Sequence, residues 1–302
     1  MNKLLLNIAN VITLNLQEIK RVELIGGKMG AVLFYYELYR ITDIKTYSDI
    51  ADILLGEVLN NIGKIKNNSI DQGLSGVGWG INYLIRNAFV EVDKDTLTDL
   101  EYHIFCSESI NFDTGFSTLS SALYLLSKPR EKDMLDEYNN KISSLLNTCN
   151  YYCLSIYDEK KKPLDLINSM LYFLIELKKQ NIHTEEVSRL IWRVSSYLMS
   201  YNMDDDLFGD SVILINLLEQ MDDSIPFKKE VLIKMTKVSC GNWNMEAYKK
   251  ILWQQILFSQ KKDELIVPVI PKLLEFATNR QQSAIEMMVP LGLYLMNAYK
   301  SE

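Results

Sequence analysis

Apolar residues recur three or four positions apart along most of this chain, which is the spacing of one face of an α-helix. In the first 18 residues the pattern is carried by Leu4, Leu5, Ile8, Val11 and Ile12. The strict apolar–polar alternation of a half-buried strand is scarce. The sequence therefore predicts an all-α protein.

The predicted helices come in pairs, in which a run of small residues leads into an apolar helix and a second helix follows. The first helices of the pairs are expected at 26–39, 73–84, 117–126, 166–174, 207–218, 243–258 and 287–296. The second helices are expected at 46–62, 95–105, 131–152, 184–199 and 227–237. Successive pairs start roughly 40 to 50 residues apart, which indicates a helix-pair repeat. This spacing fits both a closed ring and an open solenoid.

The segment Gly73–Leu84 is the clearest of these helix starts, with glycines at 73, 76, 78 and 80. Gly76 and Gly80 share a helix face, so a neighbouring helix or loop can approach closely there. Each glycine inside a helix costs roughly 1 kcal/mol relative to alanine, which indicates a packing need. A phosphate-binding loop is rejected, because residues 63–70 are not a strand and no Lys-Ser or Lys-Thr follows the glycines.

Composition narrows the classes of function. The chain has 302 residues, of which 48% are hydrophobic and 24% charged, and its net charge is -7. An acidic chain lacks the basic face typical of nucleic-acid binders, although it is compatible with a basic peptide partner. No stretch approaches the roughly 18 apolar residues of a membrane span. Polar residues also interrupt any signal-like run at the N-terminus, so we expect a cytoplasmic protein.

Gly73–Leu84 resembles the lanthionine synthetase C-like (lanthipeptide cyclase-like) family, whose members carry a Gly-Leu-(Ala/Ser)-Gly-(Ile/Val)-Gly helix in each repeat. The resemblance implies an α/α toroid with inner helices surrounded by outer helices. We expect one such domain over 1–302, with about seven helical-hairpin repeats. Gly27, Gly73 and Gly209 are then expected at or near the starts of inner helices, at the same end of the ring.

Family cyclases use a zinc ion held by a Cys in a Trp-Cys-Tyr-Gly-like motif and by a Cys-His pair in the following repeat. Phe208-Gly209-Asp210 matches the first motif from its aromatic residue onward, which puts Leu207 at the Cys position and Asp206 at the Trp position. Trp243-Asn244 stands where the Cys-His pair is expected. The family's His-Gly of the fourth repeat is replaced around 166–168. We therefore expect no metal ligands and no cofactor.

The remaining metal-binding residue types do not rebuild such a site. A catalytic zinc normally has three protein ligands, and Cys240 could supply only one. The two histidines, His103 and His183, lie in other repeats. The other cysteines show no tight metal-binding pair and are expected to be buried free thiols. Cys149 and Cys153 have the spacing of one helix face.

Asp113 is the one candidate catalytic residue, because it lies where the family places an Asp before the third repeat. The alternative reading is a helix cap or a first-turn acid. The acids 204–206 with Asp210 could bind magnesium, or they could stabilise the dipole of the helix that follows. Tyr35, Tyr36, Tyr39 and the four tryptophans are expected in the core rather than in a sugar-binding platform.

The sequence thus predicts a zinc-less lanthionine synthetase C-like protein, a pseudoenzyme that does not cyclise peptides by itself. Its expected partner is a precursor peptide or a peptide-modifying enzyme, with no nucleic acid and no membrane involved. Two alternatives stay open. One is a zinc-independent enzyme with its active site in the toroid cavity, and the other is a helical-repeat scaffold with no link to peptide modification.

Overall fold

The computed structural model describes residues 2–91, 94–106, 119–128, 135–155, 164–201, 208–221, 227–238, 245–258 and 281–300. Thirteen α-helices and two short 3-10 helices account for the regular structure of these ranges, which contain no strand. The all-α prediction is confirmed. None of the helices in these ranges is long and apolar enough to cross a membrane.

Contacts along the chain divide it into two compact units. Unit 1 consists of Met1–Ile110 together with Leu252–Glu302, and unit 2 consists of Asn111–Ile251. The boundary falls inside helix α12 (Met245–Leu257). Unit 1 therefore contains both the first and the last described helix, whereas unit 2 is one continuous stretch.

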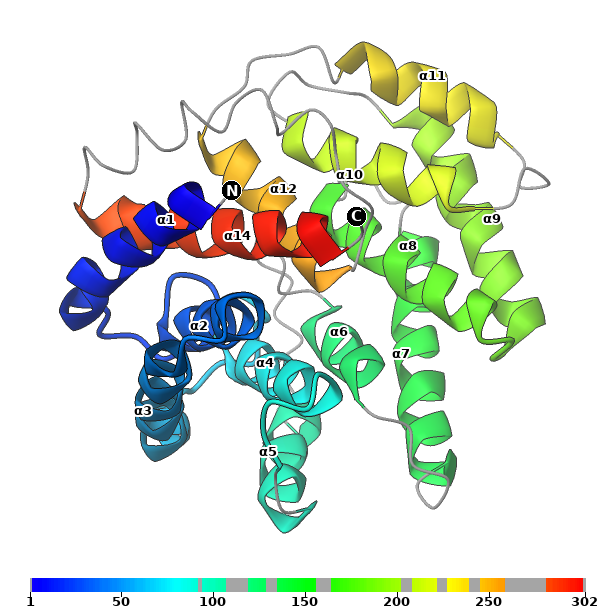
Figure 1. The fold of residues 1–302 in the computed structure, drawn as a ribbon. Helices are drawn as coiled ribbons and strands as arrows, with labels where there is room; N and C mark the ends of the chain where they lie inside the picture. The colour runs from blue at the N-terminus through cyan, green and yellow to red at the C-terminus, as the bar shows by residue number, and fades with distance from the viewer. Residues whose placement is uncertain are drawn as a thin grey trace. The chain divides into compact units, whose positions relative to one another are not determined.

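Unit 1 is built around helix α2 (Lys28–Thr42), which packs against α3 (Lys45–Asn61), α4 (Leu74–Arg86) and α14 (Gln281–Lys300). Helix α4 also packs against α5 (Lys94–Cys106), and α14 packs against α1 (Asn2–Asn15), as Figure 1 shows. The short helices η1 (Leu16–Glu18) and η2 (Ile62–Lys64) follow α1 and α3. The four helices predicted in pairs at 26–39, 46–62, 73–84 and 95–105 are all present.

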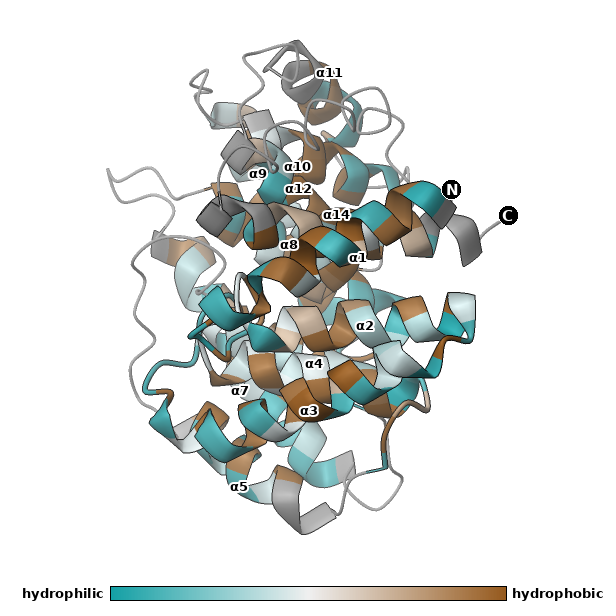
Figure 2. Ribbon diagram, turned by 60° about the vertical axis from the view of Figure 1, so that its left-hand side comes forward, coloured by the Kyte–Doolittle hydropathy of each residue, from teal (hydrophilic) through white to brown (hydrophobic). Residues whose placement is uncertain are grey.

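Burial separates the helices of unit 1 into an inner and an outer kind. Every residue of α2 from Met29 to Leu38 is buried, whereas α3 buries only Ala51, Leu54 and Val58. Figure 2 shows hydrophobic and hydrophilic residues alternating along α3 and α5. A helix that is buried all round lies inside its fold, and a helix with one apolar stripe lies on the outside.

The loops that start α2 and α4 repeat the same backbone geometry. Lys28 N donates to Arg21 O and, 46 residues later, Leu74 N donates to Asn67 O, both at 3.0 Å. Gly27 and Gly73 are the N-caps of the two helices. Ile25 N also donates to Asp71 O at 3.0 Å, which joins the two loops directly. Within unit 1, the two glycines thus lie at equivalent inner-helix starts, as predicted.

Glycines allow close packing in unit 1. A Cβ on Gly76 would overlap the carbonyl group of Ile70 in the loop before α4. A Cβ on Gly80 would come within 2.6 Å of Met29 Cε on α2, and a Cβ on Gly292 of α14 would overlap the ring of Phe34 on α2. These contacts bring α14, α2 and α4 together, as the predicted close approach required.

Unit 2 repeats the alternation of inner and outer helices. Its helices are α6 (Ser120–Ser127), α7 (Leu135–Ser155), α8 (Leu164–Lys179), α9 (Thr184–Ser200), α10 (Phe208–Glu219), α11 (Lys228–Val238) and the first half of α12. Helix α8 packs against α6, α9 and α10, and α10 packs against α11. Residues 164–175 of α8 are all buried. The outer helix α9 buries one stripe, which includes Val187, Leu190 and Val194.

Candidate functional site

Three helices of unit 2 bring an ion cluster together. Asp165 lies in the first turn of α8, Asp210 lies in the first turn of α10, and Lys250 lies in the middle of α12. Lys250 Nζ is 2.7 Å from both carboxylate oxygens of Asp210 and 3.7 Å from Asp165 Oδ2. A single ammonium group therefore lies between two carboxylates that belong to different helices.

Local geometry explains why these side chains meet. A Cβ on Gly209 would come within 3.3 Å of Ala247 Cα, so the missing side chain lets α10 and α12 approach closely. Asp210 follows Gly209, and Lys250 lies about one turn after Ala247, which brings their charges face to face. Each acid also lies at a helix N-terminus, where the helix dipole stabilises negative charge.

Hydrogen bonds hold the cluster from the side of α8. Asp165 Oδ1 accepts from Leu166 N at 2.7 Å, and Ser169 Oγ donates to Asp165 O at 3.0 Å. Asn168 Nδ2 donates to Asp210 O at 2.9 Å, which ties α8 to α10. Asn168 Oδ1 is buried and has no hydrogen-bond partner among the residues that the structure describes. The cluster is therefore fixed by backbone and side chain together.

The electrostatics of the cluster are governed by burial. Burial raises the pKa of Asp210, the Lys250 ammonium opposes that rise, and the nearby Asp165 carboxylate adds to it. Lys250 thus stabilises the ionised form of Asp210, which burial alone would disfavour. Because the ammonium already faces both oxygens of Asp210, the arrangement links three helices and does not leave Asp210 open for proton transfer.

These residues do not fit a zinc ion, because a cationic ammonium group occupies the space between the two acids. In the described ranges, no group of three or more His, Cys, Asp or Glu residues is placed to hold a metal ion. The positions that the family resemblance assigns to the zinc ligands are Leu207, Trp243 and Asn244, and they lie outside the described residues. The nearby Cys240, Asp113 and the acids 204–206 also lie outside them. Asp210 lies in a first helical turn, which fits the dipole reading of that acid.

The two histidines lie in different units. His103 is exposed on α5, and its ring contacts Tyr102 edge-on with 5.7 Å between the ring centroids. His183 is the N-cap of α9 in a left-handed conformation, with φ at 47°, and its Nε2 is 3.5 Å from Ser143 Oγ. Neither histidine belongs to the ion cluster.

Cys149 and Cys153 are buried free thiols on α7, as predicted. Burial raises the pKa of both thiols, that of Cys153 to about 11. A thiol with a raised pKa is a poor nucleophile at neutral pH, because the thiolate is the reactive form. The side chains of Cys106 and Cys240 lie outside the described set.

The aromatic residues follow the prediction of a core role in part, since Tyr39 of α2 is only half-buried. Tyr35 and Tyr36 of α2 are buried, and so are Trp79 and Trp253. Trp192 is 48% exposed on the outer helix α9, so the expectation that it belongs to the core is wrong. It occupies the solvent-facing side of a helix whose buried stripe is filled by aliphatic residues. Trp243 lies outside the described residues.

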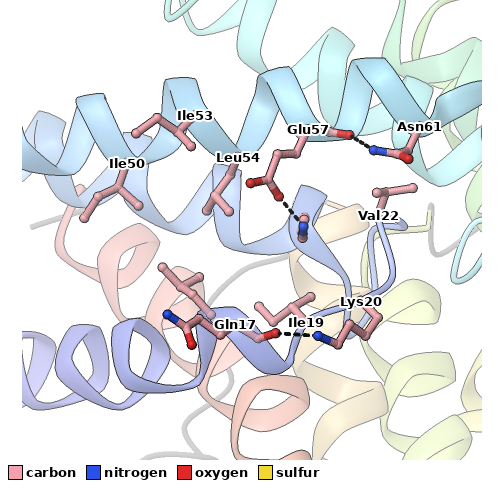
Figure 3. Close-up of a pocket in the computed structure, with 11 residues that line it drawn as sticks. Gln17, Ile19, Lys20, Val22, Ile50, Ile53, Leu54, Glu57 and Asn61 are labelled. Atoms are coloured by element: carbon pink, nitrogen blue, oxygen red, sulfur yellow. Dashed lines mark hydrogen bonds and ion pairs between the residues drawn. The ribbon is translucent and has the colours of Figure 1, made fainter.

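A groove with a cavity volume of about 470 Å³ opens between the N-terminal segment and helix α3 of unit 1 (Figure 3). Its lining residues are Leu16, Gln17, Ile19, Lys20, Val22 and Lys28 on one side, and Ile50, Ile53, Leu54, Glu57 and Asn61 of α3 on the other. Lys28 and Glu57 form an ion pair across the groove, and Lys20 Nζ donates to Gln17 O at 3.2 Å. The volume is within the range of ligand-binding pockets, about 300–1,000 Å³.

A second cavity of about 510 Å³ lies between α3, α4 and α5. Ten of its thirteen lining residues are leucine, isoleucine or valine, among them Leu59, Ile81 and Leu84, and its charged or titratable residues are Asp99 and His103. This cavity contains no lysine or arginine. The two cavities therefore flank the same outer helix and differ in chemistry.

The sequence carried a partial signal for these sites. The groove residues of α3 follow helical spacing, and apart from the buried Leu54 they lie beside the buried stripe of that helix; they are Ile50, Ile53, Leu54, Glu57 and Asn61. Asp165 and Lys250 were missed, because neither belongs to a motif and they are brought together only by packing. Comparisons with protein-family models, with curated proteins and with solved structures found no match.

Proposed function

We propose that this chain is a zinc-less lanthionine synthetase C-like protein whose helix pairs close into a toroid of about seven repeats. In this proposal it is a cytoplasmic, non-catalytic accessory of ribosomal peptide modification. It binds a precursor peptide or a peptide-modifying enzyme and leaves the chemistry to another protein.

Three features of the chain support the toroid. The two ends belong to one unit, and α14 packs against both α1 and α2. Inner and outer helices alternate in each unit. The loops before α2 and α4 are joined by the hydrogen bond from Ile25 N to Asp71 O. A ring of helix pairs needs such contacts between successive inner helices.

The ion cluster of unit 2 supports the non-catalytic part of the proposal. The resemblance points to the starts of the fifth and sixth inner helices for zinc, and Lys250 of α12 here neutralises Asp210 of α10. A buried acid that is paired with an internal lysine has a structural partner, and it is not free to bind a metal.

The groove between the N-terminal segment and α3 is the observation that supports the proposed binding of a peptide or an enzyme. It is open, it combines apolar walls with two lysines and a glutamate, and it includes Ile53, which is 66% exposed. A large exposed aliphatic residue beside charged groups is typical of a surface that another chain covers.

Metal analysis tests the absence of zinc chemistry. The purified protein, after dialysis, is expected to hold no stoichiometric zinc and to form no thioether when given a dehydrated, cysteine-containing peptide. Elemental analysis and thiol alkylation followed by mass measurement provide the two readouts. One tightly held zinc per chain, lost in Cys240→Ser, would return the protein to the cyclases.

Selection from a displayed library of random peptides tests the binding part. We expect the wild-type protein to retain peptides that Ile53→Arg no longer binds, because a charge on the exposed aliphatic wall of the groove disfavours contact with apolar side chains. Ile233→Arg is the matched control, since Ile233 on α11 is 62% exposed and lies in unit 2. If the two variants retain the same peptides, the groove is not the binding surface.

A further inference from the structure

The charges in the groove of unit 1 are unequal. Two ammonium groups, those of Lys20 and Lys28, line it together with one carboxylate, that of Glu57. Glu57 pairs with Lys28, whose side chain is 18% exposed. Lys20 is exposed, and within the described part of the chain its Nζ bonds only to a backbone carbonyl oxygen and to no acid. The groove is therefore locally cationic, although the chain as a whole carries a net charge of -7.

The walls of the groove are aliphatic. Ile50, Ile53 and Leu54 project from α3, and Figure 3 shows them on the side opposite Gln17 and Ile19. Leu54 and Ile19 are buried, whereas Ile53 stays exposed. A ligand that fills this space gains from covering aliphatic side chains and from placing a negative charge near Lys20.

An extended peptide can meet both requirements with two side chains that are close together in its sequence. Side chains two positions apart in an extended chain point to the same side, so one can carry a carboxylate and the other a branched aliphatic group. The exposed lysine attracts the carboxylate, while Ile53 and Ile50 provide the apolar contact. The groove thus offers one peptide segment both an ionic contact and an apolar contact.

We infer that this groove binds an extended peptide segment that carries an aspartate or glutamate two positions away from a leucine, isoleucine or valine. The inference rests on the proposed function and specifies the class of peptide. Lys20 is the specificity-determining residue, and Ile53 anchors the aliphatic side chain. Glu57 competes with the peptide carboxylate for Lys28, so it limits the affinity.

The test uses peptides recovered from the random library, resynthesised with a fluorescent label and titrated by fluorescence anisotropy. We expect the recovered sequences to be enriched in acidic residues two positions away from aliphatic ones. Replacing the acid by its amide should weaken binding about threefold to fivefold, as for one exposed charge pair. Lys20→Ala should weaken the acidic peptide by the same factor and leave the amide peptide unchanged.

Three variants complete the design. Glu57→Gln should strengthen binding of the acidic peptide, because the Lys28 ammonium is then free to pair with the peptide carboxylate. Lys66→Ala is the matched control for lost charge, since Lys66 is an exposed residue of unit 1 outside the groove, and it should have no effect. Leu59→Ala in the second cavity should also leave binding unchanged.

The outcomes separate this inference from the proposed function. One outcome is that binding depends on Ile53 but is equally strong for the acid and amide peptides, or is unchanged by Lys20→Ala. This outcome would overturn the acidic preference and leave the proposal of peptide binding intact. Peptides that do not depend on Ile53 would overturn both. Displacement of the peptide by octanoate at equal concentration would identify a small amphiphile as the occupant and would overturn the peptide assignment.

Discussion

The two units hold successive inner helices together in different ways. In unit 1 the helices α14, α2 and α4 meet at glycines, and the loops before α2 and α4 exchange a backbone hydrogen bond. In unit 2 the helices α8, α10 and α12 meet through Asp165, Asn168, Asp210 and Lys250, and Gly209 adds one close approach of α10 to α12. Ten of the 13 glycines of the chain fall in unit 1.

This difference shows that buried helices of one chain can be joined by two kinds of physical interaction. Backbone contact through glycine gives close packing that depends on shape and hardly on pH. Contact through buried ions depends on protonation and on each partner being present. Substitutions at the two kinds of junction should therefore have different signatures.

The largest effect is expected for Lys250→Met, which leaves Asp210 buried without its counter-charge. We expect a loss of roughly 3 kcal/mol in the free energy of unfolding at pH 7, at the lower end for buried ion pairs because 24% of the Lys250 side chain is exposed. Denaturant unfolding measures the loss. The exposed Lys229→Met on α11 is the control, and it should change stability by less than about 0.5 kcal/mol.

The pH dependence of this variant follows from Asp210. Burial already raises its pKa in the folded state, and loss of Lys250 raises it further. An acid whose folded pKa is raised favours the folded state below that pKa, and stability falls as pH rises through it. The penalty should therefore shrink on acidification, and Asp210→Asn in the same chain should restore part of it. A penalty that is constant with pH would mean that Lys250 acts through packing.

In unit 1 the corresponding test is Gly76→Ala beside Gly80→Ala on the same helix. We expect Gly76→Ala to cost about 1–3 kcal/mol, because the new Cβ meets the backbone carbonyl of Ile70. Gly80→Ala should cost less, since its Cβ meets the flexible side chain of Met29 and no backbone atom, while both variants gain about 1 kcal/mol of helix propensity.

Gly56 of α3 serves as the control for helix propensity, because nothing lies within 4 Å of a Cβ built there. Gly56→Ala should stabilise the protein by up to about 1 kcal/mol. Melting temperatures of the three variants give the order. An equal cost at Gly76 and Gly80 would contradict a backbone contact at Gly76. Gly76→Leu should be at least as costly as Gly76→Ala.

The next prediction, of a smaller effect, concerns a polar contact between α2 and α4 in unit 1. Tyr83 Oη of α4 donates to Glu37 Oε1 of α2 at 2.5 Å, and Glu37 is buried. Burial and the Glu37 carboxylate raise the pKa of Tyr83. Tyr83→Phe should lower the free energy of unfolding by about 1–2 kcal/mol. Tyr102→Phe, at a residue that is 64% exposed, should leave denaturant unfolding unchanged.

The smallest effect concerns the buried thiols of α7 in unit 2. In a Cys106→Ser and Cys240→Ser background, Cys149 and Cys153 should not react with a thiol reagent at pH 8 in the folded protein. Burial raises the pKa of Cys153 to about 11 and also raises that of Cys149, so almost no thiolate is present. Both should react fully in guanidinium. Rapid reaction of the folded protein would show that α7 opens.

The sequence predicted the helices well, because helical periodicity is a local property. Two of the predicted pairs agree with the structure to within a few residues at most helix ends. The first pair, 26–39 with 46–62, corresponds to α2 and α3. The other pair, 166–174 with 184–199, corresponds to α8 and α9, although α8 extends further at its C-terminal end. The small-residue starts also predicted the inner helices, since a glycine that tolerates a close neighbour is visible without knowing the neighbour.

The sites were harder to predict, because their residues come from distant parts of the chain. Arg21 pairs with Glu286 at 3.3 Å, and Lys250 of α12 meets Asp165 of α8. No periodicity links such positions. Trp192 was placed in the core from its residue type alone, and its helix face decided otherwise.

The contact of α14 with α1 and α2 also sets the order in which the chain can fold during synthesis. Helix α14 spans Gln281–Lys300, so at about 5–20 residues per second it emerges from the ribosome roughly tens of seconds after its partners. Unit 2 is continuous and emerges complete in the meantime. Closing the long loop between α2 and α14 also costs entropy that local helix pairs do not. The apolar surfaces that α1 and α2 bury against α14 therefore stay exposed to chaperones until α14 has emerged.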